Sequence, residues 1–399
     1  MSMIYTAGCR ARQAVFRVLH GRRLEKQQVV EGTGAVFSVA QLLRSSRLTK
    51  PMVVADGSEE PLRDRVLHAL KESDLSWSVW ELPQRTLTPQ DADDLRMAWV
   101  REACDCFILL GDGETMDFGK ISAALAAVRG RSFESLVGYN RIRRRLPPVI
   151  AIPTAAGSGA EALAWVSAPD GQGERRVVCD PALVPPFLLL DPELMEDVSR
   201  PELACASMDG ICLAVEAYLS GAADDGVRAV AADALRDYLA ALEPCWNSGG
   251  TPAQRGALMS ASRMAGEAAS AAGPGYARAL VRAAGRITGR PAGELCAAVL
   301  PVVMEKYGNH AVERLALLAE RSGAASGGTR AEDAGALVAR LRQLAFRVGL
   351  PEAMNPLPPD TVTEIAARAA AEANGRYACP AVWTAAELAE VLRSACEPK

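Results

Sequence analysis

Histidine is scarce in this chain of 399 residues, which contains only His20, His68 and His310. A site that needs three imidazoles at His-x-His or His-x3-His spacing therefore cannot form, which excludes many zinc and iron enzymes. The formal net charge of −4 argues against nucleic-acid and anionic-membrane partners, because both bind basic surfaces.

Cysteine pairs and long apolar runs are also missing. Ten cysteines are scattered without a CxxC pair, and only Cys104 and Cys106 lie close together in sequence. This usage is typical of reduced, mostly buried thiols in a cytoplasmic protein. No apolar stretch reaches the ~18 residues that a membrane span needs. Six lysines against thirty-eight arginines favour a high-GC coding sequence, and hence a bacterial source.

The length and composition predict a soluble protein of two domains. Hydrophobic residues make up 49% of the chain and charged residues 23%. Between residues 28 and 190, short β-rich runs that end in Gly or Asp alternate with helical patterns, which predicts a parallel sheet covered by helices. The β-rich runs are Pro51–Gly57, Cys106–Gly113 and Pro147–Gly159, and the helical patterns are Ala35–Ser45, Pro61–Ser73, Ala92–Ala103 and Phe118–Val128.

The second half has a different character, because from Pro201 onward the chain is rich in alanine and helical in period. Loops are expected at its Gly- and Pro-rich breaks. These breaks are Asn247–Pro252, Ala271–Gly275, Ser322–Thr329 and Pro356–Asp360. The fold class is therefore α/β plus all-α. A parallel-sheet, nucleotide-binding-type domain is expected over residues 1–192 and a helical domain over 193–399, with a cleft between them.

Two Gly-rich turns are candidates for binding a phosphate. Residues 111–120, GDGETMDFGK, follow a strand and open a helix, where glycines let the backbone approach an anion and the helix start attracts it. This turn is neither GxGxxG nor a P-loop, so a plain tight turn remains open. Residues 154–161, TAAGSGAE, have the same placement. Asp56 ends another strand, where a carboxylate can accept from a ribose hydroxyl. Together the three features favour a nucleotide site.

These segments resemble the iron-containing (group III) alcohol dehydrogenases of the dehydroquinate-synthase-like superfamily. The family pattern GGGSxxDxxK is similar to residues 111–120, and PxIAIPTTAGTGSE to residues 148–161. DPELT followed by MDALTHAIEAY is similar to DPEL and to residues 208–218. The resemblance continues through residues 300–320 to residues 379–392. It implies the two-domain fold, hydride transfer between NAD(P) and an alcohol or aldehyde in the interdomain cleft, and a homo-oligomer.

The resemblance also implies a metal site, and here the chain departs from the pattern. The family holds a divalent metal with one Asp and three His, as a Lewis acid on the substrate oxygen. Asp209 matches the Asp, whereas the three His positions fall on Leu213, Arg278 and Ala292. The family histidine linked to proton transfer falls on Arg282. Leu and Ala cannot coordinate, and a guanidinium does not lose its proton to do so. The metal-binding histidines are thus expected to be lost, with no divalent metal bound.

The arginines of this stretch allow two interpretations. Arg278, Arg282 and Arg286 are spaced i, i+4, i+8 on one helical face, which by itself indicates a solvated basic stripe. The resemblance instead places Arg278 and Arg282 toward the substrate, where a guanidinium could stabilise an alkoxide or clamp an anion. Asp209 would then pair with one of them, which makes these three residues the candidate catalytic set. Glu216 is expected to be structural.

Eight residues match the cofactor-binding positions of the family. They are Asp56, Gly111, Gly113, Asp117, Lys120, Thr154, Gly157 and Ser158. Asp112 and Glu114 replace a Gly and a Ser of the pattern, and both carboxylates oppose a pyrophosphate at the helix start. If a nucleotide binds, Asp56 favours NAD over NADP, because its charge repels a 2′-phosphate.

Two functional hypotheses follow from these observations. The first is a metal-independent NAD(P)-dependent oxidoreductase acting on a small carbonyl or alcohol, with an anionic substrate also considered. The alternative is a non-redox enzyme, or a catalytically silent binding protein, that has lost metal binding, with or without the loss of nucleotide binding. The expected partners are a small-molecule substrate and further copies of the chain.

Overall fold

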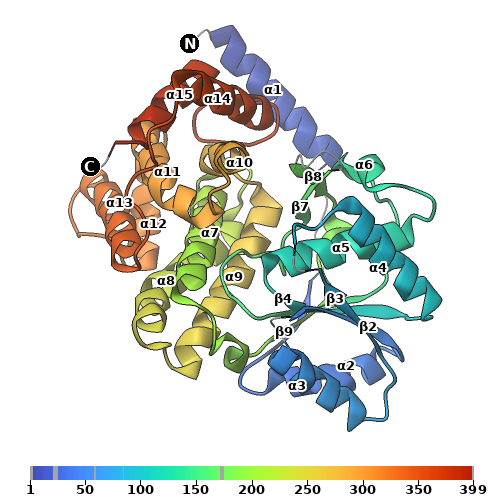
Figure 1. The fold of residues 1–399 in the computed structure, drawn as a ribbon. Helices are drawn as coiled ribbons and strands as arrows, with labels where there is room; N and C mark the ends of the chain where they lie inside the picture. Colours follow the sequence, from blue (N-terminus) through green and yellow to red (C-terminus); the bar gives the residue numbers. More distant parts are fainter. Residues whose placement is uncertain (1–2, 21–25, 58–59, 84, 171–174, 398–399) are drawn as a thin grey trace. The chain divides into compact units, whose positions relative to one another are not determined.

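Two structural units make up the protein (Figure 1). The computed structural model describes residues 3–20, 26–57, 60–83, 85–170 and 175–397. One unit spans residues 22–198, and the other comprises residues 199–399 together with 1–21. The predicted fold class is confirmed, because the first unit contains a six-stranded parallel sheet and the second is helical. Residues 1–21, which the sequence placed with the sheet, group with the helices.

The main sheet has the strand order β1-β9-β6-β4-β2-β3, and every pair in it is parallel. Its strands are β1 (Gln28–Glu31), β2 (Pro51–Asp56), β3 (Ser78–Leu82), β4 (Cys106–Gly111), β6 (Val149–Pro153) and β9 (Phe187–Leu190). The central strands β4 and β6 are buried along their whole length. Continuous burial is what apolar runs such as CFILLG predict for a parallel sheet covered on both faces.

Helices cover both faces of this sheet, with α2 and α3 on one side and α4 and α5 on the other (Figure 1). The helical segments of the unit are η1 (Ala35–Ser38), α2 (Val39–Ser45), α3 (Glu60–Lys71), α4 (Pro89–Arg101), α5 (Gly113–Ala127), α6 (Phe133–Leu136), η3 (Pro181–Leu183) and η4 (Pro192–Met195). The four helical patterns expected from the sequence fall on η1 with α2, on α3, on α4 and on α5. Leu43 and Leu70 bring α2 and α3 into the same apolar core as Ile108 of β4.

A second, three-stranded sheet was not anticipated. Its order is β5-β8-β7, from β5 (Gly138–Tyr139), β8 (Arg175–Cys179) and β7 (Trp165–Pro169). Strands β7 and β8 pair antiparallel, and β5 pairs parallel with β8. Strands β7 and β8 follow the second Gly-rich turn and lie in sequence between β6 and β9, whereas β5 precedes β6.

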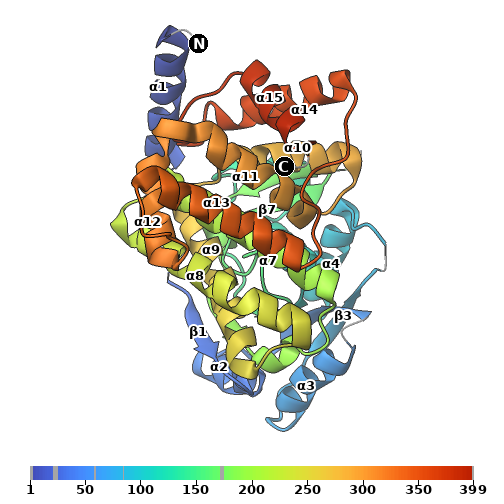
Figure 2. The same ribbon diagram turned by 90° about the vertical axis from the view of Figure 1, so that its left-hand side faces the viewer.

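The second unit is entirely helical among the residues that the structure describes (Figure 2). Its helices are α1 (Met3–His20), α7 (Arg200–Leu219), α8 (Asp225–Ser248), α9 (Pro252–Ala272), α10 (Tyr276–Thr288), α11 (Ala292–Tyr307), η5 (Gly308–His310), α12 (Val312–Ser322), α13 (Arg330–Arg347), α14 (Pro359–Ala373) and α15 (Ala385–Ser394). The four predicted loops lie at the ends of these helices. Helices α7 and α11 approach so closely that a Cβ at Gly293 would overlap the backbone of Cys205.

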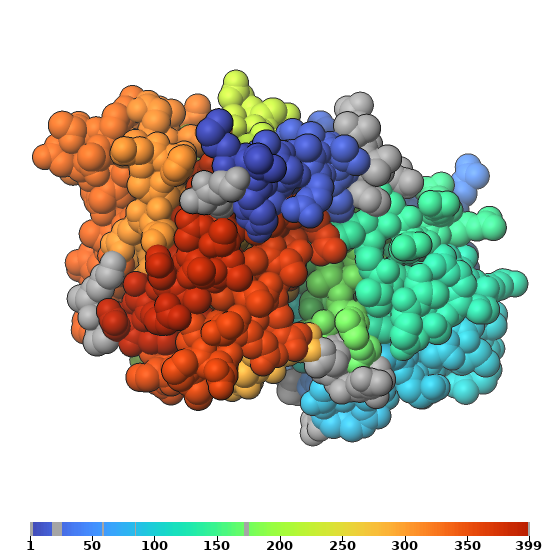
Figure 3. Space-filling view, turned by 90° about the horizontal axis from the view of Figure 1, so that it is seen from above, coloured from blue at the N-terminus to red at the C-terminus, as the bar shows by residue number. Residues whose placement is uncertain are grey.

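Helix α1 lies against the C-terminal helices of this unit (Figure 3). The Arg10 guanidinium donates to the Pro380 carbonyl at 3.0 Å, and the Gln13 amide donates to the Asn374 carbonyl at 3.2 Å. In the described part of the chain, no helix combines the length and the apolar character needed to cross a membrane.

Candidate functional site

The two Gly-rich turns meet at one edge of the main sheet. Strands β2, β4 and β6 are parallel neighbours, so their carboxyl ends lie together. The Thr154 N–H donates to the Gly111 carbonyl at 3.0 Å. A Cβ added to Gly113 would lie 2.7 Å from the Ser158 Oγ, so a larger residue where the turns touch would displace Ser158. With Asp56 ending the adjacent strand β2, the structure brings these predicted residues to a single edge.

The turn after β6 requires glycine at one further predicted position. Gly157 adopts a φ of +148°, which L side chains rarely adopt. Thr154, at the start of the same turn, is buried with 3% of its surface exposed. Both residues therefore shape the backbone of the turn, whatever the turn binds.

The first turn of α5 is partly occupied by carboxylates. Asp112 is the N-cap, and its side chain accepts from the Thr115 N–H at 2.9 Å and from the Thr115 hydroxyl at 3.0 Å. Burial raises the pKa of Glu114, and the charges of Asp112, Asp117 and Asp56 act in the same direction, against Arg175. An anion at this helix start would compete with Asp112 for the N–H groups and would face several negative charges.

Lys120 and Asp117 fasten α5 to the small sheet. Lys120 is fully buried, and its ammonium group lies 3.6 Å from the Asp117 carboxylate. The same ammonium group donates to the carbonyl oxygens of Ala160, Leu163 and Trp165, at 2.8, 3.1 and 3.5 Å. Asp117 also accepts from the Ser167 N–H at 3.0 Å. Burial lowers the pKa of Lys120 and raises that of Asp117. These contacts show that both residues stabilise the fold. Their role in binding a cofactor stays a prediction.

In the helical unit, Asp209 of α7 pairs with Arg278 of α10. The Cys296 thiol of α11 donates to the same Asp209 oxygen at 3.6 Å. Arg278 has 8% of its surface exposed, and burial lowers the pKa of its guanidinium. The interpretation of this helix face as a solvated stripe is therefore wrong for Arg278. The expected pairing of Asp209 with one arginine is confirmed.

Arg282, one turn further along α10, has a different partner. Its guanidinium pairs with Glu372 of α14 and donates to the Tyr377 hydroxyl at 2.8 Å. The Tyr377 hydroxyl in turn donates to the same Glu372 carboxylate. Only 18% of the Arg282 side chain is exposed, so this position is not a solvated stripe either. Asp209 and Glu372 thus hold one arginine each.

Glu372 and Tyr377 were not found from the sequence, because they lie 90 and 95 residues from Arg282. Helical period indicates which residues share a face of one helix, but it does not indicate which residues of a distant helix pack against that face. A buried arginine requires an acceptor, but the sequence does not show that Arg282 is buried.

Glu216 has the structural role expected of it. Its carboxylate accepts from the backbone N–H groups of Gly275, Ala277 and Arg278, at 2.7, 2.6 and 3.2 Å. It therefore caps the start of α10 from α7 and fixes the helix that carries both arginines. Burial raises the pKa of Glu216 to about 7, against the opposing effect of the three N–H donors.

This carboxyl group makes stability depend on pH. A pKa raised from 4.5 to about 7 means that the folded state keeps a proton that the unfolded chain has lost. The contribution of Glu216 to the free energy of unfolding is full below pH 4.5 and falls as the pH rises toward 7, by at most about 1.4 kcal/mol per pH unit. Urea unfolding should show that the free energy of unfolding of the wild type falls relative to that of Glu216→Gln as the pH rises from 4.5 to 7. A stability difference that is flat from pH 4.5 to pH 7 would contradict the assignment.

The side chains around Asp209 do not fit a metal ion with four protein ligands. Leu213 is fully buried and cannot coordinate, and Ala292 stands at the first position of α11. The Asp209 carboxylate is neutralised by a guanidinium. Within the described ranges, no group of three or more His, Cys, Asp or Glu side chains is arranged to hold a metal.

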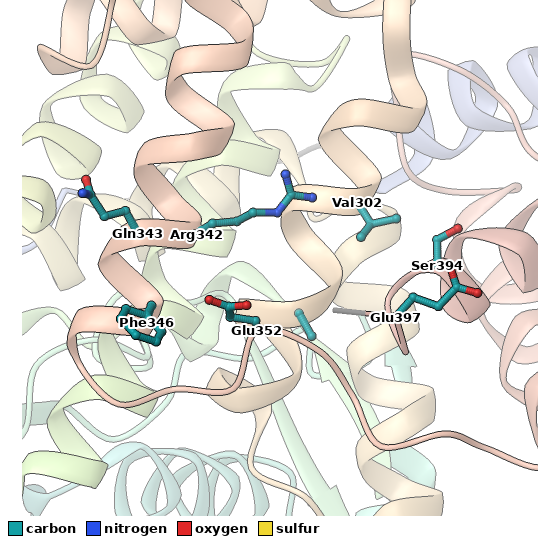
Figure 4. A pocket seen from close by; sticks show the side chains of 8 residues that line it. Val302, Arg342, Gln343, Phe346, Glu352, Ser394 and Glu397 are labelled. Atoms are coloured by element: carbon teal, nitrogen blue, oxygen red, sulfur yellow. The ribbon is translucent and has the colours of Figure 1, made fainter. Parts of the chain in front are cut away.

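A cavity of about 140 Å³ lies elsewhere in the helical unit (Figure 4). Val302 of α11 and Phe346 of α13 contribute apolar surface, and Glu352 and Glu397 contribute carboxylates. Its Arg342 pairs with Glu305 at 2.5 Å. None of the candidate site residues lines this cavity, so its position gives no support to a role in the chemistry at Arg278 and Arg282.

Family models match almost the whole chain. The model described as iron-containing alcohol dehydrogenase matches residues 26–192, and that of the C-terminal domain of the Fe-containing alcohol dehydrogenase family matches residues 203–396. The chain belongs to the iron-containing alcohol dehydrogenase family. In this family member the match to the first domain precedes the match to the C-terminal domain, which is the order of domains expected from the sequence.

Curated relatives match this family member over most of their length. A 1,3-propanediol dehydrogenase of Citrobacter freundii is 25% identical over 371 residues, which is 91% of this chain and 96% of the relative. An NAD-dependent methanol dehydrogenase of Bacillus methanolicus is also 25% identical, over 92% of this chain and 97% of the relative.

Solved structures share the fold. An alcohol dehydrogenase from Oenococcus oeni superposes with a TM-score of 0.88 at 24% identity, over 94% of this chain and 99% of that one. A sulfoacetaldehyde reductase from Bifidobacterium kashiwanohense, in complex with NAD+, gives 0.82 at 19% identity, over 93% and 97%. At these identities the likeness establishes the architecture alone.

Proposed function

We propose that this family member is an NAD-dependent oxidoreductase that interconverts a small alcohol and its aldehyde without a metal ion. The pairing of Asp209 with Arg278 carries the proposal. The one carboxylate that remains of the family's ligand set is held by a guanidinium, which brings a fixed positive charge to the place where the family pattern expects a cation.

The two arginines take different parts in this proposal. Arg278 is held by Asp209 and is the more deeply buried of the two, with 10% of its side chain exposed against 18% for Arg282. Arg282 is therefore the group proposed to meet the substrate oxygen. A guanidinium stabilises the negative charge that develops on that oxygen through charge-assisted hydrogen bonds, which is the part a Lewis-acidic metal would otherwise play.

The dinucleotide is proposed to bind at the edge of the sheet. Gly111, Gly113 and Ser158 would hold the pyrophosphate where the two turns touch, and Asp56 would bind a ribose hydroxyl. When bound, the nicotinamide would accept or supply the hydride. One relative is named as NAD-dependent and one solved neighbour holds NAD+, which favours the same cofactor here. The Asp56 carboxylate favours NAD over NADP, because its negative charge would repel the 2′-phosphate of NADP.

The charge balance of the arginine cluster favours a neutral substrate. Two guanidiniums, of Arg278 and Arg282, face two carboxylates, of Asp209 and Glu372. Because each cation already has an anionic partner, little positive charge is left to attract an anionic substrate. Two curated relatives are named for 1,3-propanediol and methanol, which are small and uncharged.

The carboxylate cap of α5 should weaken nucleotide binding. Asp112→Asn removes the charge and keeps a side chain that caps helices equally well. The dissociation constant for NADH should therefore fall by about two- to tenfold, the gain expected from removing one like charge beside a bound anion. Fluorescence titration at fixed ionic strength measures this change. Asp64→Asn, on an exposed face of α3, is the matched control and should leave the affinity unchanged. Equal NADH affinities for Asp112→Asn and the wild type would contradict this role.

Fluorescence titration of the purified protein with NADH and NADPH tests the proposed function. Saturable binding of NADH, tighter than that of NADPH, is the expected result. Failure to bind either nucleotide would overturn the proposal. That outcome would favour a non-redox or silent binding protein on the same fold, a second candidate that the carboxylates at the α5 start support.

A further inference from the structure

The hydrogen-bonded triad of Arg282, Glu372 and Tyr377 has a chemical capacity that the proposed function does not yet use. Reduction of an aldehyde needs a proton as well as a hydride. Arg282 cannot supply it, because a guanidinium keeps its proton throughout the accessible pH range. Tyr377 can, because a phenol both donates and accepts a proton.

We infer that Tyr377 is the proton donor to the substrate oxygen in aldehyde reduction, with Glu372 as the group that returns a proton to it. This inference rests on the proposed hydride transfer and names a further catalytic residue for it. The geometry that carries it is the pair of contacts at one phenolic oxygen, which accepts from the Arg282 guanidinium at 2.8 Å and donates to the Glu372 carboxylate.

The proton balance of the step is complete. As the hydride forms the new C–H bond, the carbonyl π bond breaks and its electron pair moves to oxygen. The Tyr377 hydroxyl, which donates to Glu372 in the structure, turns to the substrate oxygen. Its O–H bond breaks, its proton forms the O–H bond of the alcohol, and a phenolate remains. Arg282 stabilises that phenolate by its charge-assisted hydrogen bond. Glu372, with 25% of its side chain exposed, then passes a proton from water to Tyr377. Alcohol oxidation runs the same steps in reverse.

The charges that face Tyr377 favour this role over a purely structural one. Arg282 and Glu372 contact its hydroxyl, and Arg278 interacts electrostatically with both Tyr377 and Glu372. The phenol therefore contacts one cation and one carboxylate, and it feels the charge of a second cation. Tyr276, at the start of α10, shows the contrast: its hydroxyl binds Asn374 and accepts from the Trp383 N–H, without a charged partner.

The test compares Tyr377→Phe, which keeps the ring and removes the hydroxyl, with the wild type. With propanal and NADH, kcat should fall by about 10²–10⁴-fold, the usual contribution of a positioned proton donor. The dissociation constant for NADH should stay unchanged. A second readout needs no turnover: isobutyramide presents a carbonyl oxygen but takes no hydride. Its affinity for the NADH-loaded protein should fall by about tenfold, the effect of one lost hydrogen bond.

Glu372→Gln tests the relay even if Tyr377→Phe folds poorly. The amide keeps a hydrogen-bonding side chain but cannot take up and release a proton, so kcat should fall and should rise again with imidazole buffer concentration as the buffer replaces the relay. A merely structural role predicts no such rescue. Tyr276→Phe is the matched control, which should lose thermal stability and keep the pH profile of kcat.

Two results would overturn the inference separately. Wild-type turnover together with unchanged kcat in Glu372→Gln, or in folded Tyr377→Phe, would show that the proton comes from elsewhere while the proposed function stands. No hydride transfer by the wild type to acetaldehyde, propanal or formaldehyde would overturn the proposed function and, with it, the role of Tyr377.

Discussion

Replacing Arg282 by alanine should lower turnover by about 10²–10³-fold, the cost of removing one donor to a developing oxyanion. The effect follows from the place of Arg282 in the cluster, where its guanidinium reaches both Glu372 and Tyr377. Without it, the substrate oxygen loses its electrophile and Tyr377 loses its cationic neighbour. The nucleotide is proposed to bind in the other unit, so the NADH dissociation constant should change by less than about twofold.

Two further variants make this prediction specific. Arg282→Lys keeps the charge but not the forked donor geometry, so its turnover should lie between those of the wild type and Arg282→Ala. Arg286→Ala removes the next arginine on the same helix face, outside the proposed machinery, and should keep full turnover. Stopped-flow measurement of NADH oxidation gives all three values. Wild-type turnover in Arg282→Ala would show that this arginine takes no part in the chemistry.

Lys120→Met should produce the largest loss of stability, about 3–5 kcal/mol, the cost of removing one partner from a buried ion pair. The ammonium group donates to three carbonyl oxygens and faces Asp117, and methionine takes this cationic donor away from all four groups. The contacts join α5 to the loop after β6 and to β7, so both Gly-rich turns should loosen with them.

Lys306→Met is the matched control for this substitution. Lys306 also pairs with a carboxylate, that of Glu390 at 3.0 Å, but with 40% of its side chain exposed. Its loss should cost less than about 1 kcal/mol, as surface pairs do. Urea unfolding followed by circular dichroism measures both. If Lys120→Met matches the control, the buried contacts of Lys120 do not hold this part of the fold.

The main sheet was predictable because its signals are local. Apolar runs bounded by Gly or Asp indicated β2, β4 and β6, and helical period indicated the helices between them. The small sheet was missed for the opposite reason. Its strands β7 and β8 are short, and β8 begins with two exposed arginines, so neither carries a continuous apolar run or a clear alternation.

The candidate sites were predictable only in part. The turns at Gly111 and Thr154 could be located because glycine-rich turns after strands have a sequence signature. The part played by Asp112 followed from its charge, but its capping of α5 required coordinates. In the helical unit, spacing placed Arg278 and Arg282 on one face of α10. Which carboxylate each arginine meets depends on how α7 and α14 pack against that face, and no local pattern encodes this.

Turnover of the metal-free protein tests the central claim most directly. The protein is dialysed against EDTA, its metal content is measured by mass spectrometry, and NADH oxidation by propanal is followed before and after zinc or iron is added. A protein that uses the Arg278 and Arg282 cluster in place of a metal should turn over at its full rate without metal, and neither ion should raise that rate. Activity that disappears on chelation and returns with stoichiometric zinc or iron would contradict the claim.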